Sequence, residues 1–182
     1  MDQLPKKFPQ EVRKVKFDFF PNWQDSISSE RSAEIIFKLS QEILSKYGFD
    51  LKKDVRVLEV GSGNAVFLSY LQKQGVNVIG TDTQPRGNKE SSEIVVARIE
   101  QLPFPDELFG VVLSSKVFDD LVYNQDQNLM MKEIARVLKH NGIYLGYREF
   151  RDKEFHNKIK EIEGFDKVQG DDSMDFTVYK KS

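Results

Sequence analysis

The sequence predicts an α/β protein built on a doubly wound, mostly parallel β-sheet. Short apolar, β-branched runs alternate with segments of helical periodicity along most of the 182 residues. This alternation is typical of a parallel sheet with helices on both faces. The buried run Val55–Val60 leads directly into a glycine turn, Gly61–Gly63, and then into a second helical segment. This strand, turn and helix form the unit around which we expect the other elements to be arranged.

Length and composition exclude several classes of protein. A chain of 182 residues fits one domain with a sizeable core, and a net charge of −2 argues against a nucleic-acid partner. The absence of cysteine excludes disulfides and thiolate metal sites, and with two histidines we expect no metal site. No apolar run approaches the roughly 20 residues of a membrane span, and no signal core follows Met1. We therefore expect a cytoplasmic protein without a membrane partner; the oligomeric state stays open.

The chain divides into an N-terminal arm, residues 1–27, and one domain, residues 28–182. Three prolines interrupt the arm, which is basic at first and then aromatic between Phe17 and Trp23. Two interpretations of the aromatic part stay open. Its side chains either dock the arm on the core or close over a ligand site.

The first elements of the domain are a helix, the central strand and a second helix. Apolar residues recur at helical spacing over Ser28–Tyr47, and Gly48 can end that helix. We assign this first helix no chemistry. After the glycine turn, a helix is predicted over Ala65–Gln74, with Gly75 as its stop. Free N–H groups at the start of a helix suit a carboxylate or a phosphate.

The second strand, Asn77–Asp82, ends in a carboxylate. A parallel β-α-β unit puts the end of its second strand beside the turn that follows its first strand. Asp82 is therefore expected next to the glycine turn, where it can accept hydrogen bonds from both ribose hydroxyls of an adenosine. The alternative is an aspartate that caps the following loop. The next segment, Thr83–Glu93, is short and rich in helix breakers, so the usual helix between strands two and three is expected to be missing or vestigial.

The remaining elements continue the alternation of strands and helices. A loop or short turn is expected over Lys116–Tyr123, after the fourth strand. The last two strands are expected to pair as a hairpin. In order, the elements are a strand Ile94–Ile99, a strand Gly110–Ser114, a helix Gln125–Lys139 ended by His140–Gly142, a strand Ile143–Tyr147, a helix Asp152–Ile162, and strands Phe165–Val168 and Phe176–Tyr179.

Four stretches of the chain together resemble one family. A dinucleotide fingerprint would have glycine or alanine where this chain has Val66. The order Glu59-Val60-Gly61-Ser62-Gly63 instead resembles the first motif of the class I S-adenosylmethionine-dependent methyltransferases. Asp82 follows at the expected distance. The stretches Leu102–Asp106 with Phe109–Val112, and Glu133–Gly142, resemble the "LPFPD…FDVV" and "EIARVLKPGG" segments of the small-molecule branch of that family. The resemblance covers roughly residues 30–180.

The resemblance implies a Rossmann-like sheet of about seven strands whose last strand is antiparallel. It implies S-adenosylmethionine as cofactor and methyl transfer to a small-molecule acceptor. The site residues that it implies run along the ends of neighbouring strands. Gly61, Ser62 and Gly63 would lie close to the methionine and ribose portions of the cofactor, and Glu59 would hold the turn. Asp82 and Thr83 would bind the ribose, and Arg98, Ile99 and Glu100 would flank the adenine. Ser114 would lie near the methyl group.

The chain departs from the family pattern at several positions. Ala65 replaces a frequent third glycine, Gly110 replaces an aspartate, and Asp119 and Asp120 replace a common histidine pair. Arg98 stands where the family usually has an aspartate that recognises the adenine amine. These departures keep an alternative open, namely a non-catalytic methyltransferase-like protein that binds cofactor, a ligand or a protein partner. A nicotinamide oxidoreductase is disfavoured by Val66 and by the lack of a Tyr-x-x-x-Lys pair.

No catalytic residue is assigned from the sequence, because the sulfonium is already activated and the protein mainly positions the reactants. Asp119 or Asp120 can accept a proton from a substrate, or can be solvated loop residues. His140 is expected at the sheet edge opposite the ligand and is assigned a structural role. Candidates on the ligand side are His156, Tyr147, Arg148 and Glu149. Because the loops after strands four and five are short, we hypothesise that the aromatic arm closes the site.

Overall fold

The computed structural model describes residues 29–53, 55–84, 93–117, 127–147, 162, 164–169 and 176–182. Three helices and seven strands lie in this part of the chain. The helices are α2 (Glu30–Ser45), α3 (Val66–Lys73) and α5 (Gln127–Val137), and the strands are β1 (Arg56–Val60), β2 (Asn77–Asp82), β3 (Ile94–Val96), β4 (Phe109–Ser115), β5 (Leu138–Tyr147), β6 (Phe165–Gln169) and β7 (Phe176–Lys181).

The strands form one mixed sheet in the order β3-β2-β1-β4-β5-β7-β6. Strands β1 to β5 are parallel, whereas β7 runs antiparallel between β5 and β6. This confirms the predicted α/β architecture, its antiparallel last strand and the pairing of the final two strands. The strand order reverses between β1 and β4. In open α/β sheets, ligands bind at such a reversal, beyond the carboxyl ends of the strands.

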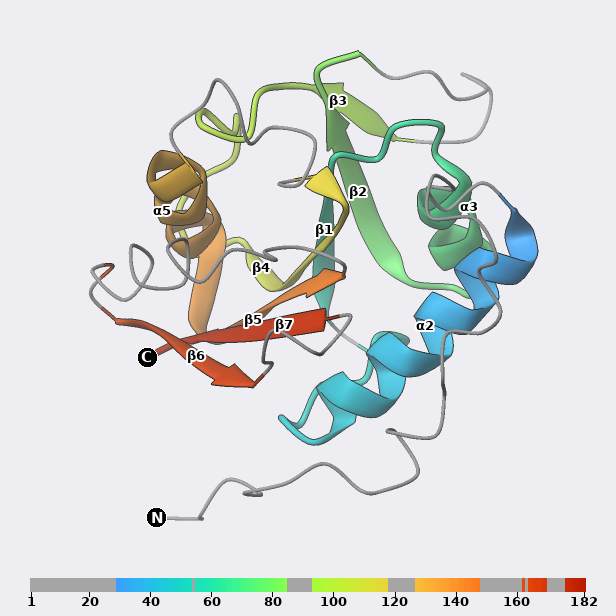
Figure 1. Cartoon of the computed structure of the whole chain (residues 1–182), viewed down its shortest axis with the longest axis horizontal. Coiled ribbons are helices and arrows are strands. Elements are labelled where there is room, and N and C mark those ends of the chain that lie inside the picture. Colours follow the sequence, from blue (N-terminus) through green and yellow to red (C-terminus); the bar gives the residue numbers. More distant parts are fainter. Residues whose placement is uncertain are drawn as a thin grey trace.

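The described helices cover both faces of the sheet. In Figure 1, α2 and α3 lie on one side and α5 on the other. Alternate residues of each central strand point to opposite faces, so Val57 and Val111 pack toward α2 and α3, whereas Leu58 and Val112 pack toward α5. All four side chains are fully buried. The continuous apolar runs in the sequence therefore correspond to strands covered on both faces.

Helix α2 begins where a polar pair of side chains satisfies its first N–H groups. The Ser29 hydroxyl accepts from the Ser32 backbone N–H at 3.2 Å, and the Ser32 hydroxyl accepts from the Ser29 N–H at 3.2 Å. This reciprocal capping fixes the start of α2 at Glu30. The predicted amphipathic helix is confirmed, with Ile36, Ile43 and Leu44 among its buried residues.

Two predicted boundaries were wrong. Helix α5 ends at Val137, and β5 begins directly at Leu138, so that residues 138–142 are strand and not a helix end followed by a turn. The reason is tertiary: Leu138 pairs with Phe109 of β4, and a register shift follows between Phe109 and Val111. Strand β3 is shorter than predicted and ends at Val96. Beyond it, the Gln101 N–H bonds the Arg98 carbonyl at 3.1 Å, which turns the chain.

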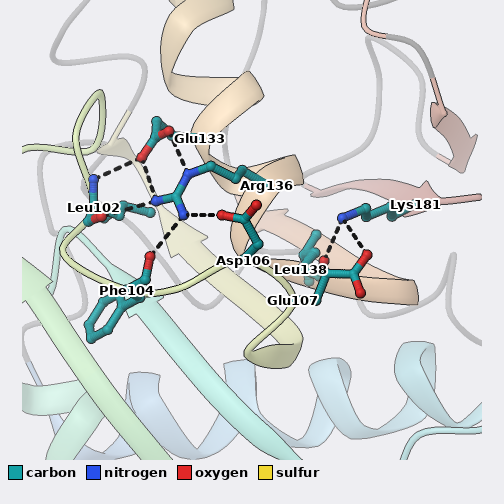
Figure 2. Close-up of polar contacts among 8 residues, drawn as sticks. All are labelled: Leu102, Phe104, Asp106, Glu107, Glu133, Arg136, Leu138 and Lys181. Atoms are coloured by element: carbon teal, nitrogen blue, oxygen red, sulfur yellow. Dashed lines mark hydrogen bonds and ion pairs between the residues drawn. The ribbon is translucent and has the colours of Figure 1, made fainter.

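Arg136 of α5 holds the segment between β3 and β4 against this helix (Figure 2). Its Nε donates to the Glu133 carboxylate at 2.8 Å, and its Nη2 donates to the same carboxylate and to the Leu102 carbonyl. Its Nη1 donates to the Phe104 carbonyl at 2.8 Å and to Asp106 at 2.7 Å. All five N–H bonds of the guanidinium are thus used. The bond from Arg136 also holds the pKa of the Glu133 carboxyl below its ordinary value.

Several expectations fall outside the described residues. They concern the arm at residues 1–27, the crossover after β2 at residues 85–92, Asp119 and Asp120, and Arg148, Glu149 and His156.

Within the described ranges, none of the helices combines the length and the apolar character that crossing a membrane requires.

Candidate functional site

The glycine turn is closed against the end of β2 by three backbone N–H groups. Those of Gly61 and Ser62 both donate to the Thr81 carbonyl, at 2.8 and 2.9 Å. That of Gly63 donates to the Asp82 carboxylate at 2.8 Å. The predicted neighbourhood of the glycine turn and Asp82 is therefore present. Because these three N–H groups already donate to β2, a ligand at the turn would have to bind other groups of the chain.

The two glycines of the turn have different surroundings. Gly61 has a φ of +72°, and a Cβ at this position would overlap the Cγ2 methyl of Val117, the second residue after β4. Gly63 has a φ of +49°, and a Cβ there would find its nearest heavy atom, the Gly61 carbonyl oxygen, 4.0 Å away. Gly61 therefore makes room for a protein side chain, and the open space lies over Gly63, beside Asp82.

Gly61→Ala is expected to destabilise the protein by about 2–3 kcal/mol. An alanine would pay about 1–2 kcal/mol for the left-handed backbone, and its methyl group would push Val117 aside. Urea denaturation measures the loss. Adding Val117→Ala should recover the steric part and leave the backbone part. Equal losses in the single and double variants would contradict the contact between Gly61 and Val117.

Asp82 binds two backbone segments with its carboxylate. Oδ2 accepts from the Gly63 N–H, and Oδ1 accepts from the Gln84 N–H at 2.7 Å. A carboxylate has about four acceptor positions, so two remain for further donors such as a pair of ribose hydroxyls. Thr83, the next predicted residue, is exposed. Asp82 is half-buried, so its carboxylate borders both the turn and the open space over Gly63.

The residues predicted beside the adenine lie next to the end of β2. The Ala97 N–H donates to the Asp82 carbonyl at 3.1 Å, which brings the following turn to the same edge. There Arg98 is exposed and forms a 2.9 Å ion pair with the half-buried Glu100, while Ile99 is buried in the core on the α5 face. The Arg98 guanidinium is thus paired with the Glu100 carboxylate.

Ser114 lies at the end of β4, next to β1, where its backbone is in register with Val60. Its side chain is buried, and its hydroxyl forms a 2.7 Å hydrogen bond with the hydroxyl of Tyr144 on β5. The side chain therefore points into the sheet packing, and the backbone of Ser114 is the part at the carboxyl edge. His140, near the start of β5, lies at the opposite edge, as predicted.

Glu59 is the penultimate residue of β1 and lies directly below the glycine turn. Its side chain is 4% exposed, and among the described residues its Oε2 has no hydrogen-bond partner. The pKa of this carboxyl is raised to about 8, chiefly because the side chain is buried; the Ser62 hydroxyl lowers it, and the nearby Asp82 carboxylate adds a smaller upward shift. These surroundings favour the protonated form of Glu59.

A small cavity lies between α2 and the carboxyl ends of β4 and β5. Its mouth is partly open, and the room inside is about that of a single water molecule. Its lining is mostly apolar and includes Ile36, Leu39 and Ser40 of α2, Leu113 and Ser114 of β4, and Tyr147 of β5. We had expected no chemistry on α2, because its amphipathic pattern indicates only core packing. Val117 and Tyr144 were also missed, because no local signal indicates their contacts with Gly61 and Ser114.

Together, a strand-order reversal, a glycine turn and an acidic residue at the next strand end define an α/β protein that binds a nucleotide-type cofactor. Comparison with known proteins specifies the class. A family model described as "Methyltransferase domain" matches residues 58–146. The Arabidopsis thaliana protein named "Probable methyltransferase PMT6" is 30% identical over 140 residues, which are 68% of this chain and 23% of that protein. The chain thus spans less than a quarter of the length of this plant relative.

Solved structures agree in fold. The PH0226 protein from Pyrococcus horikoshii has a TM-score of 0.60 at 21% identity, covering 97% of this chain and all of the other. A SAM-dependent methyltransferase from Aquifex aeolicus has a TM-score of 0.55 at 19% identity, covering 84% of this chain and 97% of the other. Residues 58–146 thus match a methyltransferase domain, and the motifs and the sheet topology are those of class I methyltransferases, which use S-adenosylmethionine as cofactor.

The residues at the glycine turn fit this cofactor. The open space over Gly63 adjoins a carboxylate with acceptor capacity for ribose hydroxyls. The buried Glu59 oxygen without a partner lies below the same turn, so a positive group nearby would find an acidic counterpart. The mainly apolar cavity lies one strand further along the sheet, beyond the switch point between β1 and β4.

Proposed function

We propose that the protein transfers a methyl group from S-adenosylmethionine to a small, uncharged acceptor. The observation that carries this proposal is the position of Asp82, whose carboxylate holds Gly63 at 2.8 Å and borders the open space above the turn. In this assignment Asp82 and Thr83 bind the ribose, Gly61–Gly63 line the methionine side, and Arg98–Glu100 flank the adenine.

The bound cofactor supplies a methyl group already activated by its sulfonium, so the task of the chain is to orient the reactants. Asp82 would fix the cofactor at the ribose, and the turn would fix it at the methionine end. Ser114 stands across the switch point, next to β1. A nucleophile held beyond the end of β4 would then face the methyl group; S-adenosylhomocysteine would leave as a neutral thioether, and the proton of the methylated acceptor would pass to solvent, so no acid or base is required from the described residues.

The cavity between α2 and the ends of β4 and β5 supports an acceptor of low polarity. Among the described residues that line it, none carries a carboxylate, ammonium or guanidinium, and the polar side-chain groups are the hydroxyls of Ser40 and Tyr147. A charged acceptor would lose hydration there without gaining an ionic partner. A hydroxyl or an aromatic amine on an otherwise apolar molecule suits this lining better, and seating such a molecule requires the cavity to widen.

Asp82→Asn is expected to weaken the binding of S-adenosylhomocysteine about 10- to 100-fold. The amide replaces a charged acceptor for two ribose hydroxyls, and each such bond contributes about 1.5–3 kcal/mol, part of which the amide retains. Isothermal titration calorimetry measures the dissociation constants. Asp166→Asn on β6, an exposed aspartate far from β2, is the matched control and should bind like the wild type.

Two outcomes would contradict the proposal. If wild-type protein shows no binding heat, the assigned cofactor site is wrong. If it binds the cofactor but methylates no member of a library of phenols, indoles and anilines, in an assay that follows S-adenosylhomocysteine, the non-catalytic alternative gains support. Equal affinities of wild type and Asp82→Asn would remove Asp82 from the site.

A further inference from the structure

Glu59 is an acidic side chain in a place where an ion is costly. It stands on β1 two residues before Gly61, it is almost fully buried, and its Oε2 has no hydrogen-bond partner in the described part of the chain. The Ser62 and Thr81 hydroxyls donate to the Glu59 backbone carbonyl, at 3.3 and 3.5 Å, and the Ser62 hydroxyl also acts on the carboxyl and lowers its pKa. A buried carboxylate without a counterion would be strongly destabilising, so these surroundings favour the protonated form.

Among the residues that the structure describes, the charged groups around Glu59 offer it no counterion. Of these residues, Asp82 on β2 is the ionisable neighbour whose field acts on Glu59, and its sign is the same. On the helices packed over this face, Lys73 of α3 pairs with Glu30 of α2 at 3.0 Å, and Lys38 pairs with Glu34. Both pairs are exposed to solvent. Two acidic groups thus lie near the turn, and no described cation compensates them.

We propose that Glu59 is a neutral acid in the free protein and releases its proton to solvent when the positively charged cofactor binds. The inference rests on the proposed function. S-adenosylmethionine carries an ammonium, a sulfonium and one carboxylate, so it adds a net positive charge to the site. The O–H bond of Glu59 breaks, its electron pair stays on the carboxylate, and the proton passes to the buffer. The ionised Glu59 then balances the charge of the cofactor, and binding and deprotonation support each other.

Calorimetric titration of the protein with S-adenosylmethionine, at about pH 6.5 in several buffers, tests this proposal. At that pH the α-amino group of the cofactor is already protonated, so a released proton comes from the protein. The binding heat should vary linearly with the ionisation enthalpy of the buffer, with a slope close to one proton released. The dissociation constant should fall about tenfold from about pH 5.5 to about pH 6.5.

Two variants test whether the released proton comes from Glu59. Glu59→Gln keeps the neutral shape and removes the ionisation, so it should bind with heats independent of buffer and with little pH dependence. His140→Gln changes an imidazole at the opposite edge of the sheet and should release the proton as the wild type does. The wild-type series decides the question even if Glu59→Gln does not fold. Buffer-independent heats of the wild type would overturn this inference alone. Absence of any binding heat would overturn the proposed function together with it.

Discussion

Replacing Arg136 by lysine is expected to lower the free energy of unfolding by about 2–4 kcal/mol. The guanidinium joins Glu133, Asp106 and the carbonyls of Leu102 and Phe104, with all donor–acceptor distances at or below 3.0 Å (Figure 2). An ammonium on a flexible stem cannot reach all of these acceptors at once, because the fork geometry belongs to arginine. Half-buried acceptors would then lose their partners. Urea denaturation followed by circular dichroism measures the change.

A matched substitution separates this network from an ordinary surface pair. Arg98→Lys also alters an arginine–carboxylate contact, but the Arg98 side chain is 62% exposed, against 30% for Arg136. Exposed pairs contribute about 0–1 kcal/mol, so this control should unfold almost like the wild type. If both variants lost the same small amount, the Arg136 network would have no special role in holding the segment between β3 and β4.

The stability of the free protein is expected to fall as pH rises from about 5 to about 8, by several kcal/mol from Glu59 alone. The folded pKa of Glu59 is about 8, whereas an unfolded glutamate titrates near pH 4.3. Between these values the native state binds one more proton than the unfolded state. The slope of the unfolding free energy with pH is therefore negative, and the stabilisation is complete only below the unfolded pKa.

Glu59→Gln should remove this dependence. The variant should be more stable than the wild type above about pH 8, and the difference should vanish toward about pH 5. Thermal or urea unfolding at several pH values, without cofactor, provides the comparison. Glu34→Gln, which changes an exposed carboxylate paired with Lys38, is the control and should keep the wild-type slope. Parallel pH curves for wild type and Glu59→Gln would show that Glu59 ionises normally.

Much of the fold could be predicted because its signals are local. The β-branched runs became β1, β2 and β4, and the amphipathic pattern became α2, with the expected order along the chain. The boundary between α5 and β5 was wrong, since Val137 and Leu138 continue the helical spacing of apolar residues. Only the pairing of Leu138 with Phe109 ends the helix there, and a contact between residues so far apart leaves no trace in a local pattern.

The neighbourhood of the candidate site could also be predicted, because the handedness of β-α-β units brings Gly63 to Asp82 whatever the details. What each group does there could not be derived in this way. The hydroxyl of Ser114 is engaged by Tyr144, 30 residues away, and Val117 occupies the space beside Gly61. Both contacts depend on how β4 packs against its neighbours.

The amino-acid sequence by itself determined the succession of strands and helices, the glycine turn with its acidic partner, and hence the class of protein. Periodicity, backbone freedom and motif spacing are properties of neighbouring residues, so they can be read along the chain. The tertiary structure alone decided that the three N–H groups of the turn bind β2, that a low-polarity cavity lies under α2, and that Glu59 is buried without a described counterion. These depend on burial and on contacts across the sheet, which arise only when distant segments pack together.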